Sequence, residues 1–206
     1  MKKFIEFFIP SFSILGTSII LFITFGGNDL NEQLLLLGLR RTARFSLLLF
    51  LVPYVSRPFY LIKKNKISRF LLKYRKEFGI GFGFSFFSHI ALISLLFYTH
   101  SGSELPESIG LDDFLIGIPG IVFVILMLIT SFQAIKPLIS IQLWSRIHLI
   151  GLHFVWIIFF LCLLSKIIFP KKTFHGLDYY PYIILLILAF LMRIFSFYNS
   201  NKKVIQ

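Results

Sequence analysis

The sequence lacks most of the features from which soluble catalytic sites are built. Its 206 residues include a single cysteine, Cys162, which excludes an internal disulfide and a thiolate metal cage. No polar segment is long enough for a nucleotide-binding domain, and no glycine-rich phosphate loop follows a strand-like run. The sequence order of a Ser/His/Asp hydrolase is absent, as are paired carboxylates within the apolar segments. Any electron or group donor must therefore come from outside this chain.

Acidic residues are scarce as well, with 9 against 21 lysines and arginines, which gives a net charge of +12. The basic residues cluster in short segments beside hydrophobic runs. This placement is typical of cytoplasmic loops that face anionic lipid. We therefore expect membrane lipids, and no nucleic acid, as partners of these charges.

The sequence is rich in long hydrophobic segments. Hydrophobic residues make up 57% of the chain, 27 residues are phenylalanine, and the mean hydropathy is +0.85. A spanning helix needs about 20 apolar residues. The sequence therefore predicts an all-α polytopic membrane protein, with a single transmembrane domain over residues 1–206 that forms a bundle of six helices. The predicted spans are residues 4–25, 39–60, 78–99, 114–135, 145–169 and 182–197.

Two of these spans carry irregularities. The second is the weakest, because Arg40, Arg41 and Arg44 interrupt it, and the fourth has a helix break at Pro119. The first follows Lys2 and Lys3 as a signal peptide would. Its apolar run is too long for one and no clear cleavage site follows, so we expect a retained helix.

Lysine and arginine bias predicts the orientation. With the N-terminus inside, 15 of the 21 basic residues fall in inner segments and 6 in outer ones. An even number of spans then places both termini in the cytoplasm, and a bacterial inner membrane is the expected location. The basic segment 61–76 is predicted to be a cytoplasmic loop on the lipid surface, with docking of an acidic partner as the alternative.

Two of the predicted spans contain histidines. His89 lies about 16 Å along the third span, near mid-bilayer, while His148 and His153 lie in the fifth. Intramembrane ionisable groups are costly and mark functional sites by default. Imidazoles on two facing helices can hold a haem iron from both sides.

Which histidine pairs with His89 stays open at this point. Depth favours His153, but tilt and boundary error leave His148 possible. The two differ by about 140° around the helix, so both cannot face one iron. A hydrogen bond across helices is the alternative role for each of them. His100, at an outer boundary, and His175, in an outer loop, are expected to be ordinary polar residues.

Several segments resemble the ferric-reductase-like transmembrane domain family. They are the stretch 38–53, the stretch 74–79 with His89 ten residues on, Thr130-Ser131, and Trp144-Ser-Arg-Ile-His148. Together they cover a core of about residues 30–165. Members without a flavin domain look most similar, above all the haem-binding membrane subunit of the periplasmic methionine sulfoxide reductase system.

That resemblance implies a six-helix bundle that binds haem b. Electrons would come from a quinol or a cytoplasmic flavin reductase, so quinone or FMN is a further cofactor candidate, and would pass to an extracytoplasmic reductase. His89 and His148 match haem-ligand positions. The family usually has another histidine where this sequence has Leu161. Compensation by His153, a single haem, and loss of haem are the alternatives.

Arginines complete the candidate site. Arg41 and Arg44 are three residues apart and share a helix face. Guanidinium groups suit haem propionates, while headgroup binding or an ion pair within the bundle is the alternative. We therefore expect an electron-transfer subunit of an oxidoreductase complex, and not a stand-alone enzyme. The rival hypothesis is a haem-free transporter or assembly factor.

Overall fold

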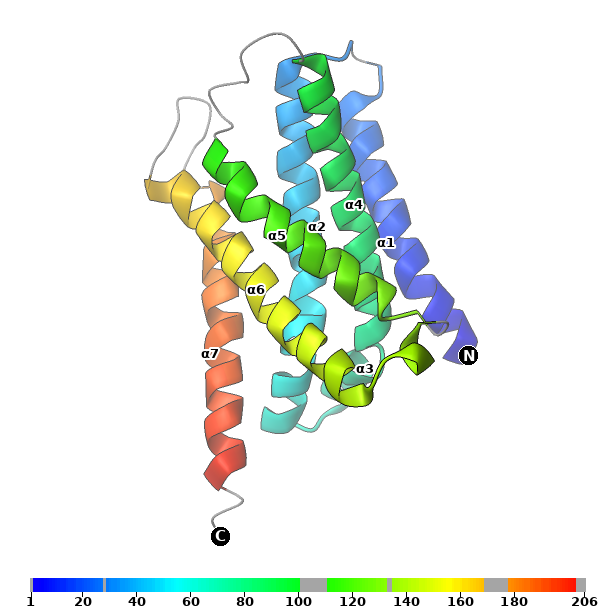
Figure 1. Cartoon of the computed structure of the whole chain (residues 1–206), viewed down its shortest axis with the longest axis vertical. Helices are drawn as coiled ribbons and strands as arrows, with labels where there is room; N and C mark the ends of the chain where they lie inside the picture. Colours follow the sequence, from blue (N-terminus) through cyan, green and yellow to red (C-terminus); the bar gives the residue numbers. More distant parts are fainter. Residues whose placement is uncertain (1, 28, 101–110, 133–134, 169–177, 203–206) are drawn as a thin grey trace. The chain divides into compact units, whose positions relative to one another are not determined.

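The computed structural model describes residues 2–27, 29–100, 111–132, 135–168 and 178–202. Within these ranges the chain forms seven α-helices and one 3₁₀ turn, and no strand (Figure 1). The all-α prediction is confirmed for this part of the chain. The elements are α1 (Lys2–Phe25), α2 (Glu32–Ile62), α3 (Lys66–Lys73), α4 (Arg75–Thr99), α5 (Leu111–Ile129), η1 (Lys136–Leu138), α6 (Ile141–Ile168) and α7 (Tyr180–Lys202).

Five of the described helices, α1, α2, α4, α6 and α7, are long and apolar enough to cross a membrane. In α5 the apolar stretch Gly117–Ile129 is shorter than these five helices. Large side chains point outward on the long helices, with Phe7 and Phe22 both 76% exposed and Phe197 71% exposed. Such a surface is stable in lipid and not in water. The six-span bundle with cytoplasmic termini stays a prediction.

Helix α2 differs most from its predicted bounds. It begins at Glu32, seven residues before the predicted start, and runs unbroken past the arginines to Ile62. The Asn31 side chain caps it by accepting a hydrogen bond from the Leu34 amide at 2.9 Å. Glu32 adds a favourable charge in the first turn. These capping signals, and not hydropathy, determine where α2 starts.

Helix α5 was predicted to end at residue 135 and to break at Pro119, and both expectations are wrong. The helix continues through Pro119 and ends at Ile129. After it the backbone tightens, as the Ser131 and Phe132 amides donate to the carbonyls three residues earlier. Lipid-exposed helices tolerate proline when neighbouring groups satisfy the freed carbonyl.

A short helix also interrupts the predicted loop 61–76. Asn65 and Ser68 cap α3 reciprocally: the Ser68 amide donates to Asn65 Oδ1 at 2.7 Å, and the Asn65 amide donates to Ser68 Oγ at 3.0 Å. This pair satisfies two amides that a helix start leaves without intrahelical partners. The basic loop therefore contains a defined helix.

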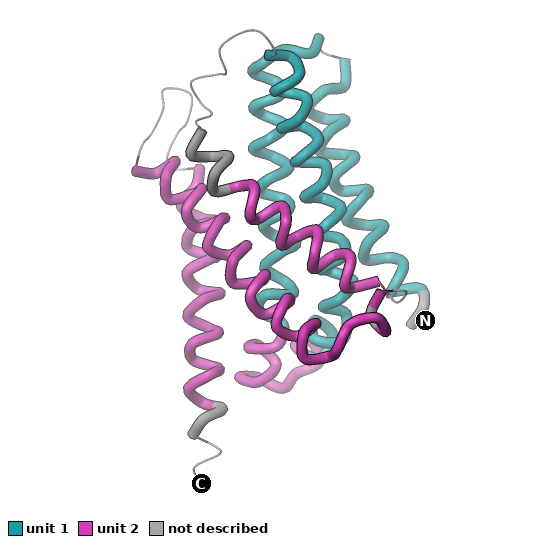
Figure 2. The backbone as a smooth tube through the Cα atoms, viewed as in Figure 1, with its two compact units in different colours: residues 1–56, 69–105 teal, residues 57–68, 106–206 magenta. Residues whose placement is uncertain are grey.

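The chain divides into two compact units (Figure 2). Unit 1 comprises residues 1–56 and 69–105, and unit 2 comprises 57–68 and 106–206. The single transmembrane domain expected over residues 1–206 stays a prediction.

Small residues bring the helices of unit 1 together. A Cβ on Gly16 of α1 would lie 2.7 Å from the Phe45 ring of α2, and one on Gly38 would lie 2.8 Å from the Phe25 ring. A Cβ on Gly81 of α4 would lie 2.9 Å from the Cβ of Ser13 of α1. Close backbone approach at small residues is the usual way helices pack in lipid.

In unit 2, α6 packs between α5 and α7. Gly151 of α6 faces the Met127 side chain of α5, and the Phe123 and Phe154 rings are in tilted contact with their centroids 4.8 Å apart. On the other side, the Trp156 indole donates to the Leu186 carbonyl of α7 at 3.0 Å. Trp156 is therefore a packing residue between two helices.

Candidate functional site

His89 faces a buried threonine on the neighbouring helix of unit 1. Its Nδ1 lies 3.1 Å from Thr42 Oγ1, and Thr42 is fully buried. The Thr42 hydroxyl lies 2.8 Å from the Gly38 carbonyl of its own helix and 3.2 Å from that of Leu39. A hydroxyl has one proton to donate. If Thr42 donates to Gly38, the His89 Nδ1–H donates to Thr42, and Nε2 keeps the lone pair.

A second polar pair extends this contact along α2 and α4. Ser46 Oγ and Ser85 Oγ lie 2.9 Å apart, and both residues are fully buried. Ser46 follows Thr42 by four residues, and Ser85 precedes His89 by four. The two contacts are therefore one turn apart on antiparallel helices. They fix the register that places His89 against Thr42.

His148 has a similar partner in unit 2. Its Nε2 lies 3.1 Å from the hydroxyl of Thr130, just after α5, and that hydroxyl lies 2.7 Å from the Leu126 carbonyl. The Trp144 indole donates to the Thr130 carbonyl at 3.1 Å, and its ring is in tilted contact with the His148 ring, with the centroids 4.3 Å apart. The imidazole is thus held by a hydroxyl on one side and an indole face on another.

His153 has different neighbours. Its imidazole lies near Arg193 of α7, whereas His148 contacts Thr130 just after α5. Their different neighbours agree with the predicted angle of about 140° between them. The two histidines therefore serve different helix contacts.

Among the predicted arginines, Arg41 is engaged inside unit 1. Its Nη1 donates to Thr24 Oγ1 of α1 at 3.1 Å, and Thr24 lies 2.7 Å from the Ile20 carbonyl. Arg44 is half-buried on the same helix. A contact within the bundle, one of the alternatives for this cluster, is what Arg41 makes. A role for either arginine toward a propionate stays a prediction.

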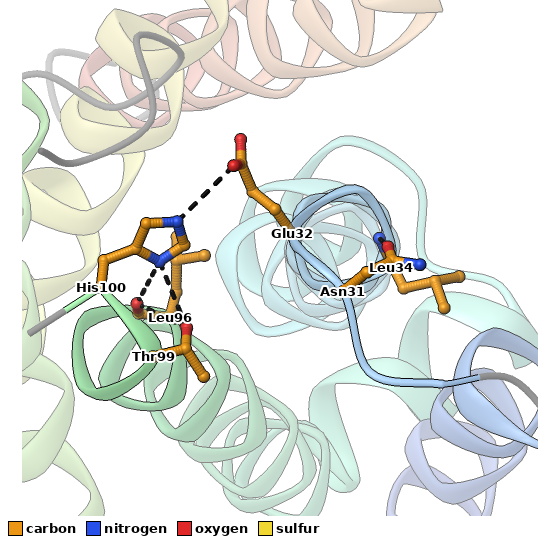
Figure 3. A network of polar contacts seen from close by, with 6 residues as sticks. All are labelled: Asn31, Glu32, Leu34, Leu96, Thr99 and His100. Carbon is orange, nitrogen blue, oxygen red and sulfur yellow. Dashed lines mark hydrogen bonds and ion pairs between the residues drawn. The ribbon is translucent and has the colours of Figure 1, made fainter. Parts of the chain in front are cut away.

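His100 closes the end of α4, as Figure 3 shows. Its Nδ1 lies 2.9 Å from the Leu96 carbonyl, and its Nε2 lies 3.5 Å from the Glu32 carboxylate of α2. Both ring nitrogens face protein acceptors. His175 lies outside the described residues.

The threonine partners were missed in the sequence. In three places a threonine hydroxyl lies within hydrogen-bond distance of the carbonyl four residues earlier and also contacts a basic side chain on another helix: Thr24 with Arg41, Thr42 with His89, and Thr130 with His148. Thr130 belongs to the Thr130-Ser131 pair that resembles the family. No signal in the sequence pairs Thr42 with His89, which are 47 residues apart.

Comparison with protein families places these residues in context. Residues 37–164 match the family described as ferric reductase like transmembrane component, which is 128 of the 206 residues. The chain belongs to the ferric reductase-like transmembrane family. The matched region includes Thr42, His89, Thr130, His148 and His153. No curated protein and no solved structure matches the chain.

Membership of the ferric reductase-like family, together with five apolar helices, supports an integral membrane protein and suggests membrane electron transfer. The finer resemblance to the methionine sulfoxide system stays a prediction. His89, Arg41 and Arg44 belong to unit 1, and His148 and His153 to unit 2. The pairing of His89 with either helix α6 histidine also stays a prediction. Among the described residues, no three or more His, Cys, Asp or Glu side chains gather as a larger metal site would require.

Proposed function

We propose that this protein is a membrane cytochrome that binds haem b and moves single electrons across the bilayer. In this proposal the chain forms six spans with both termini in the cytoplasm of a bacterial cell. Haem, when bound, supplies the one-electron Fe³⁺/Fe²⁺ couple. The chain supplies ligands, spacing and electrostatics.

The observation that carries the proposal is the Thr42-held imidazole of His89. Metal-ligating histidines almost always donate their second ring N–H to an oxygen acceptor, which fixes ring orientation. His89 makes such a contact with Thr42 at 3.1 Å inside a helix long enough to span the membrane. The donors therefore fit haem iron by their chemistry, since they are imidazoles in apolar helices, with Arg41 and Arg44 close to Thr42 along α2.

We propose His148 as the second residue that would hold the haem. His148 also lies within hydrogen-bond distance of a threonine hydroxyl, but through Nε2, so Nδ1 is the nitrogen that this contact would leave for iron. Arg44 and Arg41 are proposed to bind propionates through charge-assisted hydrogen bonds. If His89 and His148 both hold the haem, the chemistry that it would supply is electron transfer.

The first experiment is a visible spectrum of the purified protein in detergent, oxidised and dithionite-reduced, with a pyridine haemochrome assay. We expect a sharp α-band on reduction and haem in near-stoichiometric amount. His89→Ala and His148→Ala should each lose the bound haem. His100→Ala, directly after α4, is the matched control, since both of its ring nitrogens already face protein acceptors, and it should retain haem.

The outcomes separate the alternatives. Loss of haem in His153→Ala with retention in His148→Ala would move the second ligand to His153. Full haem in His89→Ala would overturn the site. Protein that stays haem-free after expression with ample haem would overturn the function and favour a haem-free transporter or assembly factor.

The electron donor is proposed to be a quinol or the FMN of a cytoplasmic flavin reductase, and the acceptor an extracytoplasmic reductase. Mixing oxidised protein with a reduced quinol, or with NADH and a flavin reductase, tests the donor directly. If the α-band of reduced haem appears with one mixture and not with the other, that mixture contains the donor. Reduction by neither, in protein that dithionite reduces, would contradict both donors.

A further inference from the structure

We propose that Thr42 is a positioning residue that sets the tautomer of His89 and leaves Nε2 as its ligating nitrogen. The inference deepens the haem function proposed above and rests on it for its consequences at the iron. The tautomer itself is a property of the protein alone.

The proposal rests on the number of hydrogen-bond donors and acceptors around the Thr42 hydroxyl. The hydroxyl has one proton, and the fully buried Oγ1 lies 2.8 Å from the Gly38 carbonyl and 3.1 Å from His89 Nδ1. A buried carbonyl oxygen can only accept. The Leu39 carbonyl is a second acceptor here, 3.2 Å from Thr42 Oγ1 and a backbone hydrogen-bond partner of His89. In the proposed arrangement Thr42 donates to a carbonyl of its own helix and accepts from Nδ1–H. The lone pair of the neutral imidazole is then on Nε2.

The surroundings hold this arrangement in place. The Ser46–Ser85 contact, one turn away, ties α2 to α4 at 2.9 Å. Four residues before Thr42, the Phe25 ring of α1 and the Leu92 side chain of α4 occupy the space that a side chain on Gly38 would need, so both helices approach α2 closely there. The Phe86 ring lies 6.2 Å from the His89 ring. The threonine therefore meets the imidazole in a packed setting.

A donated hydrogen bond at Nδ1 also has a chemical effect. It makes the opposite nitrogen more basic, and a more basic ligand favours the ferric over the ferrous state. Thr42 should thus keep the reduction potential lower than it would be without the hydroxyl. Loss of such an outer contact typically weakens metal binding roughly 10–100-fold.

The deciding experiment measures the tautomer in haem-free protein, by ¹⁵N NMR of histidine-labelled protein in detergent micelles. A protonated and an unprotonated ring nitrogen differ widely in chemical shift, and the spectrum of His89→Ala identifies the His89 signals. We expect protonated Nδ1 and unprotonated Nε2 in the wild type. Protonated Nε2 with unprotonated Nδ1 would overturn the proposal without any variant at Thr42.

Variants add the causal test. Thr42→Val keeps the shape and removes the hydroxyl, so His89 should become a mixture of tautomers, while Thr42→Ser should restore the wild-type signal. Thr17→Val is the matched control, because Thr17 is also buried and donates to the carbonyl four residues earlier, at 2.8 Å. A wild-type tautomer in folded Thr42→Val would overturn the role of Thr42.

Haem readouts separate this inference from the proposed function. In protein that binds haem, Thr42→Val should bind it roughly 10–100-fold more weakly and shift the reduction potential upward, with Thr42→Ser near the wild type. Unchanged affinity and potential, despite a changed tautomer, would refute the effect on iron. If the wild type binds no haem, the proposed function fails, while the NMR result still decides the tautomer.

Discussion

At the scale of single residues, glycines and threonine hydroxyls make the closest contacts between the helices. Thr42 and Thr130 each use one oxygen to contact a carbonyl and an imidazole, which satisfies polar groups where water is absent. The glycines have the complementary role of letting helices approach. Together they explain how a unit with polar residues inside packs tightly enough to hold a histidine in one orientation.

Gly81→Ala should destabilise unit 1. A Cβ there would lie 2.9 Å from Ser13 Cβ, and this atom cannot move without its helix. We expect a loss of about 1–3 kcal/mol, as for other overpacked positions, seen as a lower thermal unfolding midpoint in detergent.

Gly79→Ala is the matched control two residues earlier on α4, where a Cβ would meet nothing within 4 Å. It should leave stability unchanged or raise it slightly, since alanine is the better helix former. Adding Ser13→Gly to Gly81→Ala should recover much of the loss. Equal midpoints for Gly79→Ala and Gly81→Ala would contradict the close packing of α1 on α4.

At the scale of elements, hydropathy located the helices and local chemistry decided their ends. The five long helices were predicted from apolar runs and are present. The start of α2 required the Asn31 cap, and α3 required the Asn65–Ser68 pair, which apolar counting does not detect. The histidine-bearing helices and the different neighbours of His148 and His153 were also predictable from spacing. The Thr42–His89 contact was not, because it depends on the register of two distant segments.

Helix α3 combines two kinds of exposed side chain. Lys66, Arg69 and Lys73 are exposed, and so are Ile67 at 63% and Phe70 at 41%. Ser68 and Tyr74 are buried, so the element packs inward on one side only. An exposed face with both apolar and basic groups is typical of helices that lie in the bilayer interface.

Removing three charges from α3 should therefore weaken its interaction with anionic lipid. We expect phosphatidylglycerol to raise the unfolding midpoint of the wild-type protein more than phosphatidylcholine does, and Lys66→Gln/Arg69→Gln/Lys73→Gln to lose most of that difference. Each basic group near an anionic surface contributes about 1 kcal/mol. Lys166→Gln, at the end of α6, is the control and should keep the difference. A triple variant that responds like the wild type would contradict the interfacial role.

At the scale of the whole molecule, the open question is whether α5 crosses the membrane. Its 19 residues give a length of about 28 Å, close to the hydrocarbon thickness of about 30 Å. Pro119 does not end it, and its apolar part packs on α6 through Gly120 and Ile158. Six crossings would keep both termini on one side, and with six predicted spans 15 of the 21 basic residues fall in the inner segments. Five crossings would place them on opposite sides.

Single engineered cysteines before and after α5 test whether this helix crosses the membrane. In a Cys162→Ala background, Ser103→Cys precedes α5 and Leu138→Cys follows it, where the native leucine is 77% exposed. We expect a membrane-impermeant thiol reagent, added to intact cells, to label Ser103→Cys and not Leu138→Cys, and to label both after lysis. Lys64→Cys should behave like Leu138→Cys, because the basic segment is predicted to be cytoplasmic. Labelling of Ser103→Cys and Leu138→Cys from the same side would reduce the spans to five and separate the termini. Electron transfer across the bilayer would then need a different helix arrangement around His89.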